Sequence, residues 1–283
     1  MLDQSILEHY QLESNNIQQL AGGDINEVYL VETAGESTVI KVNDRETYPG
    51  MFEAEAKGLD LLRESESFDT PDVRSTFTLD KYQILELEYL QSGHPANRFA
   101  EIFAQKLVKL HQFSADFFGN DHDNYIGSLP QSNRKHTSWA EFFVTERLFP
   151  QLKLAVDQGL IDQSKRKQVE AFARFVPELW PKEPPALLHG DLWSGNYMTL
   201  ADGSPALIDP AVYFGHREID LGMMELFGGF DPAILDAYQE LFPLENGWKV
   251  RVSYNQIYPL MVHLNLFGRS YWGQIESILR EFS

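Results

Sequence analysis

The sequence predicts an α+β fold with two lobes: a small antiparallel-sheet lobe with one helix, and a larger, mainly helical lobe. Three observations support this prediction. Short β-prone runs and a single helical pattern occupy the first third of the chain, and a polar segment with Gly and Pro follows at 91–95. Beyond this segment, apolar residues recur mostly at helical spacing. We therefore expect an N-terminal lobe over 1–90 and a C-terminal lobe over 91–283.

Four short runs rich in β-branched and aromatic residues predict the strands of the small lobe. A turn-like sequence at 34–37 joins the first two runs. After the second run, Phe52, Ala56 and Leu59 lie near helical spacing and predict a helix over 51–63. The predicted strands are 27–31, 38–42, 73–79 and 82–87.

Stretches with an apolar face of helical period predict most of the large lobe. A proline-rich segment at 181–185 ends the first group of helices. Two β-prone runs at 196–200 and 205–208 flank an Asp-Gly turn at 202–203 and predict a hairpin. The predicted helices are 98–113, 138–156, 164–179, 232–241, 250–267 and 272–282.

Length and composition are those of a globular protein. The 283 residues are 43% hydrophobic, enough for one large or two small domains with sizeable cores. With no cysteine, disulfides and thiol catalysis are excluded. No run of about 18 apolar residues predicts a membrane span. The N-terminus lacks the basic and apolar regions of a secretory signal. We expect a cytoplasmic protein with no membrane partner and, without a coiled coil, a monomer.

The formal net charge of −19 is the unusual feature of the composition. It excludes nucleic acid as a partner, because binding to phosphates requires clustered Lys and Arg. Two interpretations of the acidity stay open. It either maintains solubility or attracts a cationic substrate such as an amine-bearing sugar.

The most informative motif is HGDLWSGN at 189–196, in which Asp191 stands five residues before Asn196. A second aspartate, Asp209, ends an apolar run downstream. Phosphoryl transfer from ATP needs a carboxylate facing the acceptor hydroxyl, and an amide and a carboxylate that hold Mg²⁺ against the phosphates. We therefore predict a kinase that uses ATP and Mg²⁺, with Asp191 as the catalytic residue.

Asn196 and Asp209 are the predicted metal ligands. Mg²⁺ prefers oxygen ligands and usually takes only one or two protein side chains beside water and phosphate oxygens. A strand-end turn favoured by Pro210 would explain Asp209 by itself. Its position one hairpin after Asp191 favours the ligand interpretation.

Lys41 lies in the apolar run 39–42, where its ammonium either faces solvent or enters a cleft. A kinase uses such a lysine to bind the α- and β-phosphates, held by a glutamate of the next helix. Glu53 and Glu55 both begin that helix. We favour Glu55, because the apolar face of the helix runs close to it.

Two further segments are predicted to bind the nucleotide because of their positions. Gly22 and Gly23 precede the lysine strand, where a glycine loop lets backbone amides approach phosphates, although Gly-Gly is also common in hairpin turns. Glu88, Tyr89 and Leu90 form the connection between the lobes, from which backbone groups would bind the adenine edge.

Supporting roles are predicted for His189 and Asp220. His189 ends an apolar run, and we expect it to hydrogen-bond the loop backbone rather than to transfer protons. A buried Asp220 at the start of a helix would accept N–H bonds from the catalytic loop. His216 and Arg217 either brace the loop or contact phosphate, and the sequence leaves both roles open.

These motifs resemble those of the fructosamine kinase (ketosamine-3-kinase) family, which is related to aminoglycoside phosphotransferases and choline kinases. The resemblance rests on HGDLWSGN at 189–196, DPAVYFGHREIDL at 209–221, FEAEA at 52–56 and WAEFFVTERL at 139–148, together with Gly119 and the NYIG sequence at 124–127. It covers nearly the whole chain.

The resemblance implies a two-lobed protein-kinase-like fold and ATP-dependent phosphorylation of a ketosamine on the 3-hydroxyl of its sugar. Such phosphorylation makes the adduct unstable and returns the free amine, a deglycation repair. The acceptors would be ribulosamines, erythrulosamines or fructosamines, on protein lysines or small amines. The resemblance also implies that Trp193 stacks on the sugar, with loop packing as the alternative, and that Gln131 and Asn133 contact the acceptor.

Two other functions stay open from the sequence. The protein could be another small-molecule kinase of the same fold, acting on an aminoglycoside, a choline-like amine or a sugar. It could also be a nucleotide-binding protein without catalysis. The complete set of Lys41, Asp191, Asn196 and Asp209 argues against the second, because a protein without catalysis has no physical need for all four.

Overall fold

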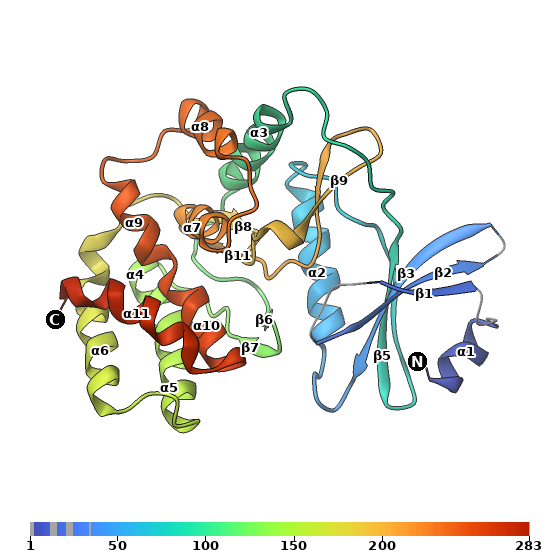
Figure 1. Cartoon of the computed structure of the whole chain (residues 1–283), viewed down its shortest axis with the longest axis horizontal. Helices are drawn as coiled ribbons and strands as arrows, with labels where there is room; N and C mark the ends of the chain where they lie inside the picture. Colours follow the sequence, from blue (N-terminus) through green and yellow to red (C-terminus); the bar gives the residue numbers. More distant parts are fainter. Residues whose placement is uncertain (1–2, 12–15, 21–24, 34, 283) are drawn as a thin grey trace.

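The computed structural model has the two-lobed α+β architecture that the sequence predicts (Figure 1). The sheet lies at one side of the molecule, the helical lobe at the other, and helix α2 between them. Within the described part of the chain, no helix combines the length and the apolar character that a membrane crossing requires. The described residues are 3–11, 16–20, 25–33 and 35–282.

The small lobe is a five-stranded antiparallel sheet in the order β1-β2-β3-β5-β4. Helix α1 covers one face and contributes Ile6 to a cluster with Ile40 and Val42 of β3. Because side chains alternate along a strand, Lys41 between these two residues points to the opposite face, toward α2. The bounds are α1 Gln4–His9, β1 Ile17–Gln19, β2 Glu27–Thr33, β3 Glu36–Asp44, α2 Met51–Glu64, β4 Val73–Leu79 and β5 Tyr82–Glu88.

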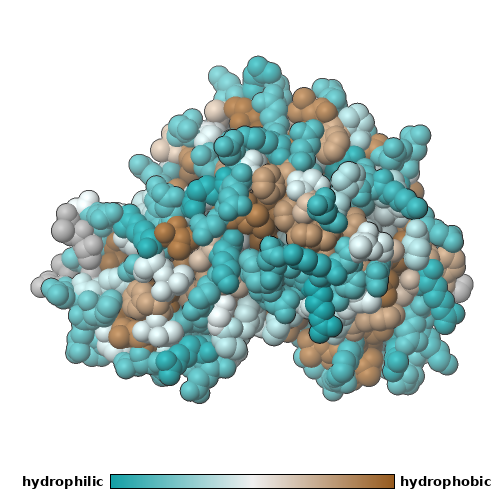
Figure 2. Space-filling model, turned by 180° about the vertical axis from the view of Figure 1, so that it is seen from behind, coloured by the Kyte–Doolittle hydropathy of each residue, from teal (hydrophilic) through white to brown (hydrophobic). Residues whose placement is uncertain are grey.

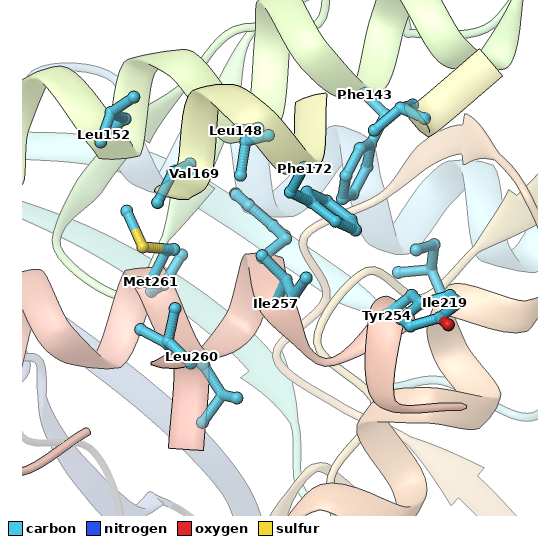
Figure 3. Packing of buried hydrophobic residues seen from close by; sticks show 14 of the residues in the cluster. Phe143, Leu148, Leu152, Val169, Phe172, Ile219, Tyr254, Ile257, Leu260 and Met261 are labelled. Atoms are coloured by element: carbon cyan, nitrogen blue, oxygen red, sulfur yellow. The ribbon is translucent and has the colours of Figure 1, made fainter. Parts of the chain in front are cut away.

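Nine α-helices make up most of the described large lobe. Their main cluster buries one face of α10 against α5 and α6, and Figure 3 shows Leu260 and Met261 of α10 opposite Leu152 and Val169. The bounds are α3 Phe99–Gln112, α4 Trp139–Phe142, α5 Phe149–Asp157, α6 Gln163–Leu179, α7 Glu218–Leu226, α8 Pro232–Leu241, α9 Trp248–Asn255, α10 Ile257–Phe267 and α11 Trp272–Leu279.

Two helix predictions need correction. The segment predicted as one helix over 250–267 is two helices, α9 and α10, that meet at Gln256. Pro259 lacks the N–H that would continue the helical hydrogen bonds there. The segment 138–156 is helical but includes a π-helical stretch, Phe143–Leu148, just before Pro150. Such insertions keep a helix continuous while shifting the register of its side chains.

Short β ladders organise the loops between the helices. Only the β9–β10 hairpin was predicted, and the other two pairs were not. Three-residue strands carry too little periodic pattern to be recognised, since tertiary pairing decides them. The bounds are β6 Asn124–Ile126, β7 Leu129–Gln131, β8 Ala186–Leu188, β9 Tyr197–Thr199, β10 Pro205–Leu207 and β11 Tyr213–Gly215, with 3₁₀ turns at Ser194–Asn196, Arg269–Tyr271 and Arg280–Phe282.

The surface is mostly hydrophilic, as a net charge of −19 suggests. Figure 2 shows hydrophilic side chains over most of the rear face, with apolar patches between them and an indentation along its lower edge.

Candidate active site

Two loops meet where the lobes face each other. Strand β8 pairs with β11, and the carbonyl of His189 accepts from the N–H of Ala211 at 2.9 Å. Gly190 directly follows His189 and has φ +82°. A Cβ at this position would come within 2.1 Å of the Ala211 carbonyl oxygen. Glycine is therefore required at this position, because both the backbone conformation and the close approach exclude a side chain. The loop that carries Asp191 is thereby held against the one that carries Asp209.

Asp191 is half-buried at the base of the cavity between the lobes. The side-chain amide of Asn196 donates to its Oδ2 at 3.0 Å and to its backbone oxygen at 2.9 Å. Burial raises the pKa of Asp191 to about 7. The Asn196 hydrogen bond opposes this rise, and the negative charge of Asp209 adds to it. A carboxylate with a pKa near neutrality is well suited to accept a proton from a hydroxyl.

Lys41 joins the two lobes through two ion pairs, in which Lys41 and Glu55 are largely buried and Asp209 is partly exposed. Its Nζ lies 2.6 Å from Oε1 of Glu55 on α2 and 2.5 Å from Oδ1 of Asp209. Burial by itself would lower the pKa of Lys41, but the two carboxylates raise it above its ordinary value. The lysine therefore stays charged, as binding to phosphate requires.

Helix α2 supplies Glu55 and not Glu53 because Glu53 lies on the exposed face. The buried face of α2 also approaches the Asp209 loop closely, since a Cβ on Gly58 would lie 3.3 Å from Val212 and 3.4 Å from Pro210. Packing thus fixes Glu55 relative to both Lys41 and Asp209.

Glu55→Gln is expected to lower kcat/KM for ATP by about tenfold or more, because a charge-assisted hydrogen bond contributes about 1.5–3 kcal/mol. Glu53→Gln removes the same charge from the exposed face of the same helix and is expected to leave the value unchanged. Steady-state kinetics with varied ATP measures both. Equal effects of the two substitutions would contradict the role of Glu55.

The donors needed for a magnesium ion are present beside Asp191. Both Asn196 and Asp209 line the cavity, and since the nitrogen of the Asn196 amide faces Asp191, its oxygen is left for another partner. Asp209 has φ +55°, a conformation that aspartate tolerates better than most residues. The described residues hold no group of three or more His, Cys, Asp or Glu side chains suited to a metal. One amide and one carboxylate fit an ion that takes its other ligands from phosphate and water.

His189 and Asp220 hold the catalytic loop from behind. Asp220 on α7 accepts from the backbone N–H groups of His189 at 2.8 Å and Gly190 at 3.0 Å. Nε2 of His189 lies 2.9 Å from the carbonyl oxygen of Ile208, to which it can only donate. Burial lowers the pKa of His189, so the neutral ring binds the backbone of both loops.

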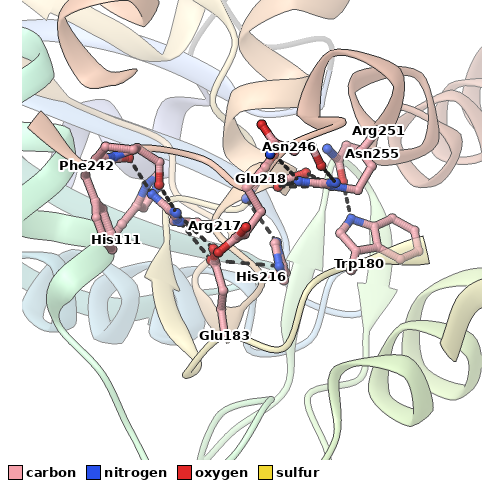
Figure 4. Close-up of polar contacts among 12 residues, drawn as sticks. His111, Trp180, Glu183, His216, Arg217, Glu218, Phe242, Asn246, Arg251 and Asn255 are labelled. Atoms are coloured by element: carbon pink, nitrogen blue, oxygen red, sulfur yellow. Dashed lines mark hydrogen bonds and ion pairs between the residues drawn. The ribbon is translucent and has the colours of Figure 1, made fainter. Parts of the chain in front are cut away.

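Buried ion pairs anchor the start of α7 and hence Asp220 (Figure 4). Arg217 binds Glu183 with Nε and Nη2, at 2.7 and 2.8 Å. Nε and Nη2 of Arg251 likewise donate to the carboxylate oxygens of Glu218, at distances from 2.6 to 3.1 Å. His216 is also buried, 3.8 Å from Glu183. The sequence left open whether His216 and Arg217 brace the loop or contact phosphate. Their contacts are those of residues that brace the loop.

A cavity of about 750 Å³ extends from these residues into the large lobe. Trp193 lies at its edge with 40% of the side chain exposed. A Cβ on Gly195 would lie 2.2 Å from the Trp193 ring, so the indole covers this glycine. One face of the ring is therefore used in loop packing, and the side chain still lines the cavity.

Several predicted contacts are not at the cavity. Gln131 and Asn133 are buried and do not line it; both donate to Oδ1 of Asn124, at 2.7 and 3.0 Å. Gly22 and Gly23 lie outside the described residues. Glu88 and Leu90 line a second, smaller cavity of about 460 Å³, and Tyr89 lines neither.

The cavity also has an apolar wall that was not predicted from the sequence. It comes mostly from α10, together with Met223 of α7 and residues that follow α7 and α10. A signal was present, because α10 is apolar around nearly its whole circumference, which indicates two buried faces. The wall residues are Met223, Phe227, Tyr258, Pro259, Val262, His263, Leu266, Phe267 and Tyr271.

Comparisons of the sequence agree on one family. A model of that family, described as fructosamine kinase, matches residues 2–282. A probable ketoamine kinase of Enterococcus faecium is 38% identical, over 99% of this chain and 99% of that protein. A probable ketoamine kinase of Vibrio parahaemolyticus is 37% identical, over 97% of this chain and 94% of the relative.

Solved structures give the same result. A crystal structure from Haemophilus somnus, provisionally assigned as a fructosamine-3-kinase, superposes with a TM-score of 0.85 at 29% identity, over 99% of this chain and 95% of that one. A similar assignment from Thermobifida fusca reaches 0.83 at 33% identity, covering 98% and 97%. An aminoglycoside phosphotransferase reaches 0.68 at 14% identity over 99% of each chain, a likeness of fold alone.

Proposed function

Because this chain belongs to the fructosamine kinase family, as its motifs predicted, we propose that it transfers the γ-phosphate of ATP to the 3-hydroxyl of a ketosamine sugar. The chain is a phosphotransferase, and its two-lobed fold is that of the kinases. The acceptor would be a ribulosamine, erythrulosamine or fructosamine, carried by a small amine or a protein lysine.

The observation that carries the proposal is the convergence of four side chains on one cavity. Lys41 comes from the small lobe, and Asp191, Asn196 and Asp209 come from two loops of the large lobe. A lysine, a lone carboxylate and an amide–carboxylate pair are the groups that phosphoryl transfer to an alcohol requires.

In the proposed reaction, Asp191 orients the acceptor and receives its proton. The sugar oxygen bonds to the γ-phosphorus while the bond from that phosphorus to the bridging β-phosphate oxygen breaks, leaving ADP. The hydroxyl proton passes to a carboxylate oxygen of Asp191. Asn196 holds Oδ2 of Asp191 at 3.0 Å, which directs the carboxylate at the acceptor.

The remaining residues hold the nucleotide and the metal. Lys41, kept charged by Glu55, would bind phosphate oxygens. Asn196 and Asp209 would hold Mg²⁺, whose positive charge stabilises the phosphate oxygens when it is bound. Trp193 would lie against the sugar with the part of its ring that Gly195 does not cover.

The biological consequence we propose is deglycation. A 3-phosphorylated ketosamine is unstable, so phosphorylation would release the free amine and repair the modified molecule.

The test measures ADP release with Mg²⁺-ATP. We expect turnover with the ribulosamine or fructosamine of lysine and none with unmodified lysine. Mass spectrometry should then show a phosphorylated adduct followed by free lysine. Turnover with an aminoglycoside and with no ketosamine would leave a kinase but remove the proposed acceptor. A stable phosphorylated adduct would remove the deglycation step alone.

A further inference from the structure

Helix α10 has two apolar faces, one in the main core and one toward the cavity. Ile257, Leu260, Met261 and Leu264 recur at helical spacing and lie in the main core. A second set, offset around the helix, lines the cavity: Pro259, Val262, His263, Leu266 and Phe267, of which Val262 also belongs to the main core. Helices at a protein surface ordinarily carry one apolar stripe. The second stripe therefore indicates an apolar ligand in the cavity.

The outer part of this stripe forms a cluster of rings with Phe227, which follows α7, and Tyr271, which follows α10. The His263 ring lies 4.7 Å from that of Phe227, 5.4 Å from that of Phe267 and 5.2 Å from that of Tyr271, between centroids. Phe227 is 43% exposed and Phe267 is 50% exposed. Large exposed rings around a cavity leave apolar area that a ligand would cover. We call these four residues the aromatic wall.

His263 gives the aromatic wall one polar acceptor. Its Nδ1 lies 2.8 Å from the carbonyl oxygen of Pro259, so Nδ1 must carry the hydrogen of this bond. Burial lowers the pKa of His263, which keeps the ring neutral. Nε2 then has a lone pair and no hydrogen-bond partner among the described residues. It can accept a hydrogen bond from a donor in the cavity.

At the aromatic wall, the nearby charges favour a cation over an anion. Lys41 is the only Lys or Arg among its described lining residues, and two carboxylates already pair with it. Asp191 adds a further carboxylate. Aromatic faces also attract cations within about 6 Å. A ligand carboxylate would find no cationic partner at the aromatic wall, whereas an ammonium group would find rings and an acceptor.

We propose that the aromatic wall binds the substituent on the amine nitrogen of the acceptor, and selects ketosamines whose substituent is apolar and lacks a carboxylate. This inference rests on the proposed function. A ketosamine is a protonated secondary amine with a sugar on one side and a substituent on the other. With the sugar at Asp191, the substituent lies along the apolar wall of the same cavity.

The experiment compares adducts of one sugar, ribulose, on three amines: benzylamine, methylamine and glycine. For the unsubstituted protein we expect kcat/KM to fall from the benzylamine to the methylamine adduct by about tenfold, the effect of about 1.4 kcal/mol from ring contacts. The glycine adduct, with its carboxylate, should be poorer than the methylamine adduct. The difference should lie in KM, because the substituent is remote from the reacting atoms.

Two variants test the wall itself. Phe267→Ala and Phe227→Ala should each lower kcat/KM for the benzylamine adduct toward the methylamine value and leave the methylamine adduct within about twofold. Phe149→Ala is the matched control, because Phe149 is 41% exposed and lies outside the cavity lining. Thermal unfolding of each variant verifies that the fold is intact.

The outcomes separate this inference from the proposed function. Turnover of the methylamine adduct with no preference for benzylamine, or with a preference for glycine, keeps the ketosamine kinase and overturns the role of the wall. Equal losses on the benzylamine and methylamine adducts in both variants also overturn it, since the rings would then act on the sugar site or the fold. No turnover of any adduct removes the proposed function and this inference together.

Discussion

Replacing Asp191 with asparagine is expected to lower kcat by about 10²–10⁴-fold, the range contributed by a positioned general base. The substitution keeps the shape of the side chain and its contact with Asn196, since the amide oxygen can still accept. It removes the atom that takes the proton from the acceptor hydroxyl. Affinity for ATP should stay within about twofold, because Asp191 binds neither phosphate nor adenine in the proposed reaction.

ADP release measures kcat for this variant, and fluorescence or calorimetric titration measures ATP affinity. Asp202→Asn is the control: Asp202 is an exposed aspartate in the turn between β9 and β10, where it accepts from the N–H of Ser204 at 2.9 Å. The Asp202→Asn variant should keep full activity. Turnover of Asp191→Asn at the level of the unsubstituted protein would refute the mechanism. Loss of ATP binding along with turnover would instead assign Asp191 to nucleotide binding.

Arg251→Met is expected to destabilise the protein by about 3–5 kcal/mol, the typical effect of removing one partner of a buried ion pair. Arg251 makes three contacts with the Glu218 carboxylate and also donates to the carbonyl oxygens of Glu245 and Asn246. Both members of the pair are buried. The substitution leaves the Glu218 charge without a partner at the first residue of α7.

Chemical denaturation of Arg251→Met measures the loss of unfolding free energy, with two controls. Arg166→Met breaks the more exposed pair with Glu170 on α6 and should cost less than about 1 kcal/mol. The double substitution Glu218→Gln/Arg251→Met should be more stable than Arg251→Met, because no buried charge remains unpaired. Should Arg251→Met unfold like Arg166→Met, the ion pair would not be what anchors α7.

The predicted family, fold and kinase class are confirmed, and the reason lies in short, local patterns. Lys41 was singled out as the charged residue within the apolar run 39–42. The helical period of α2 distinguished Glu55 from Glu53. Each of these inferences needed only neighbours within one element, which is the range over which periodicity carries information.

Polar residues in the loops were harder to interpret. Gln131 and Asn133 were expected at the acceptor, yet they are buried and bind Asn124. Sequence distinguishes polar from apolar side chains but not a buried hydrogen-bonding network from a binding site, since both need the same residue types. His216 and Arg217 illustrate the same limit, because their partner Glu183 stands 34 residues before Arg217.

The aromatic wall depended entirely on tertiary structure. The apolar residues of α10 are visible in the sequence, but which face enters the core and which faces a cavity depends on where α5, α6 and the loop after α7 lie. The prediction of one helix over 250–267 also missed the break between α9 and α10 at Gln256.

The sequence by itself determined the family and the two-lobed fold, and it predicted the residues for phosphoryl transfer, because short apolar runs, helical period and a tight loop act over a few residues. Only the tertiary structure decided that Asp209 also pairs with Lys41, which polar residues are internal braces and which rings remain exposed in the cavity. Those outcomes depend on contacts between segments distant in the chain, and no local pattern encodes such contacts.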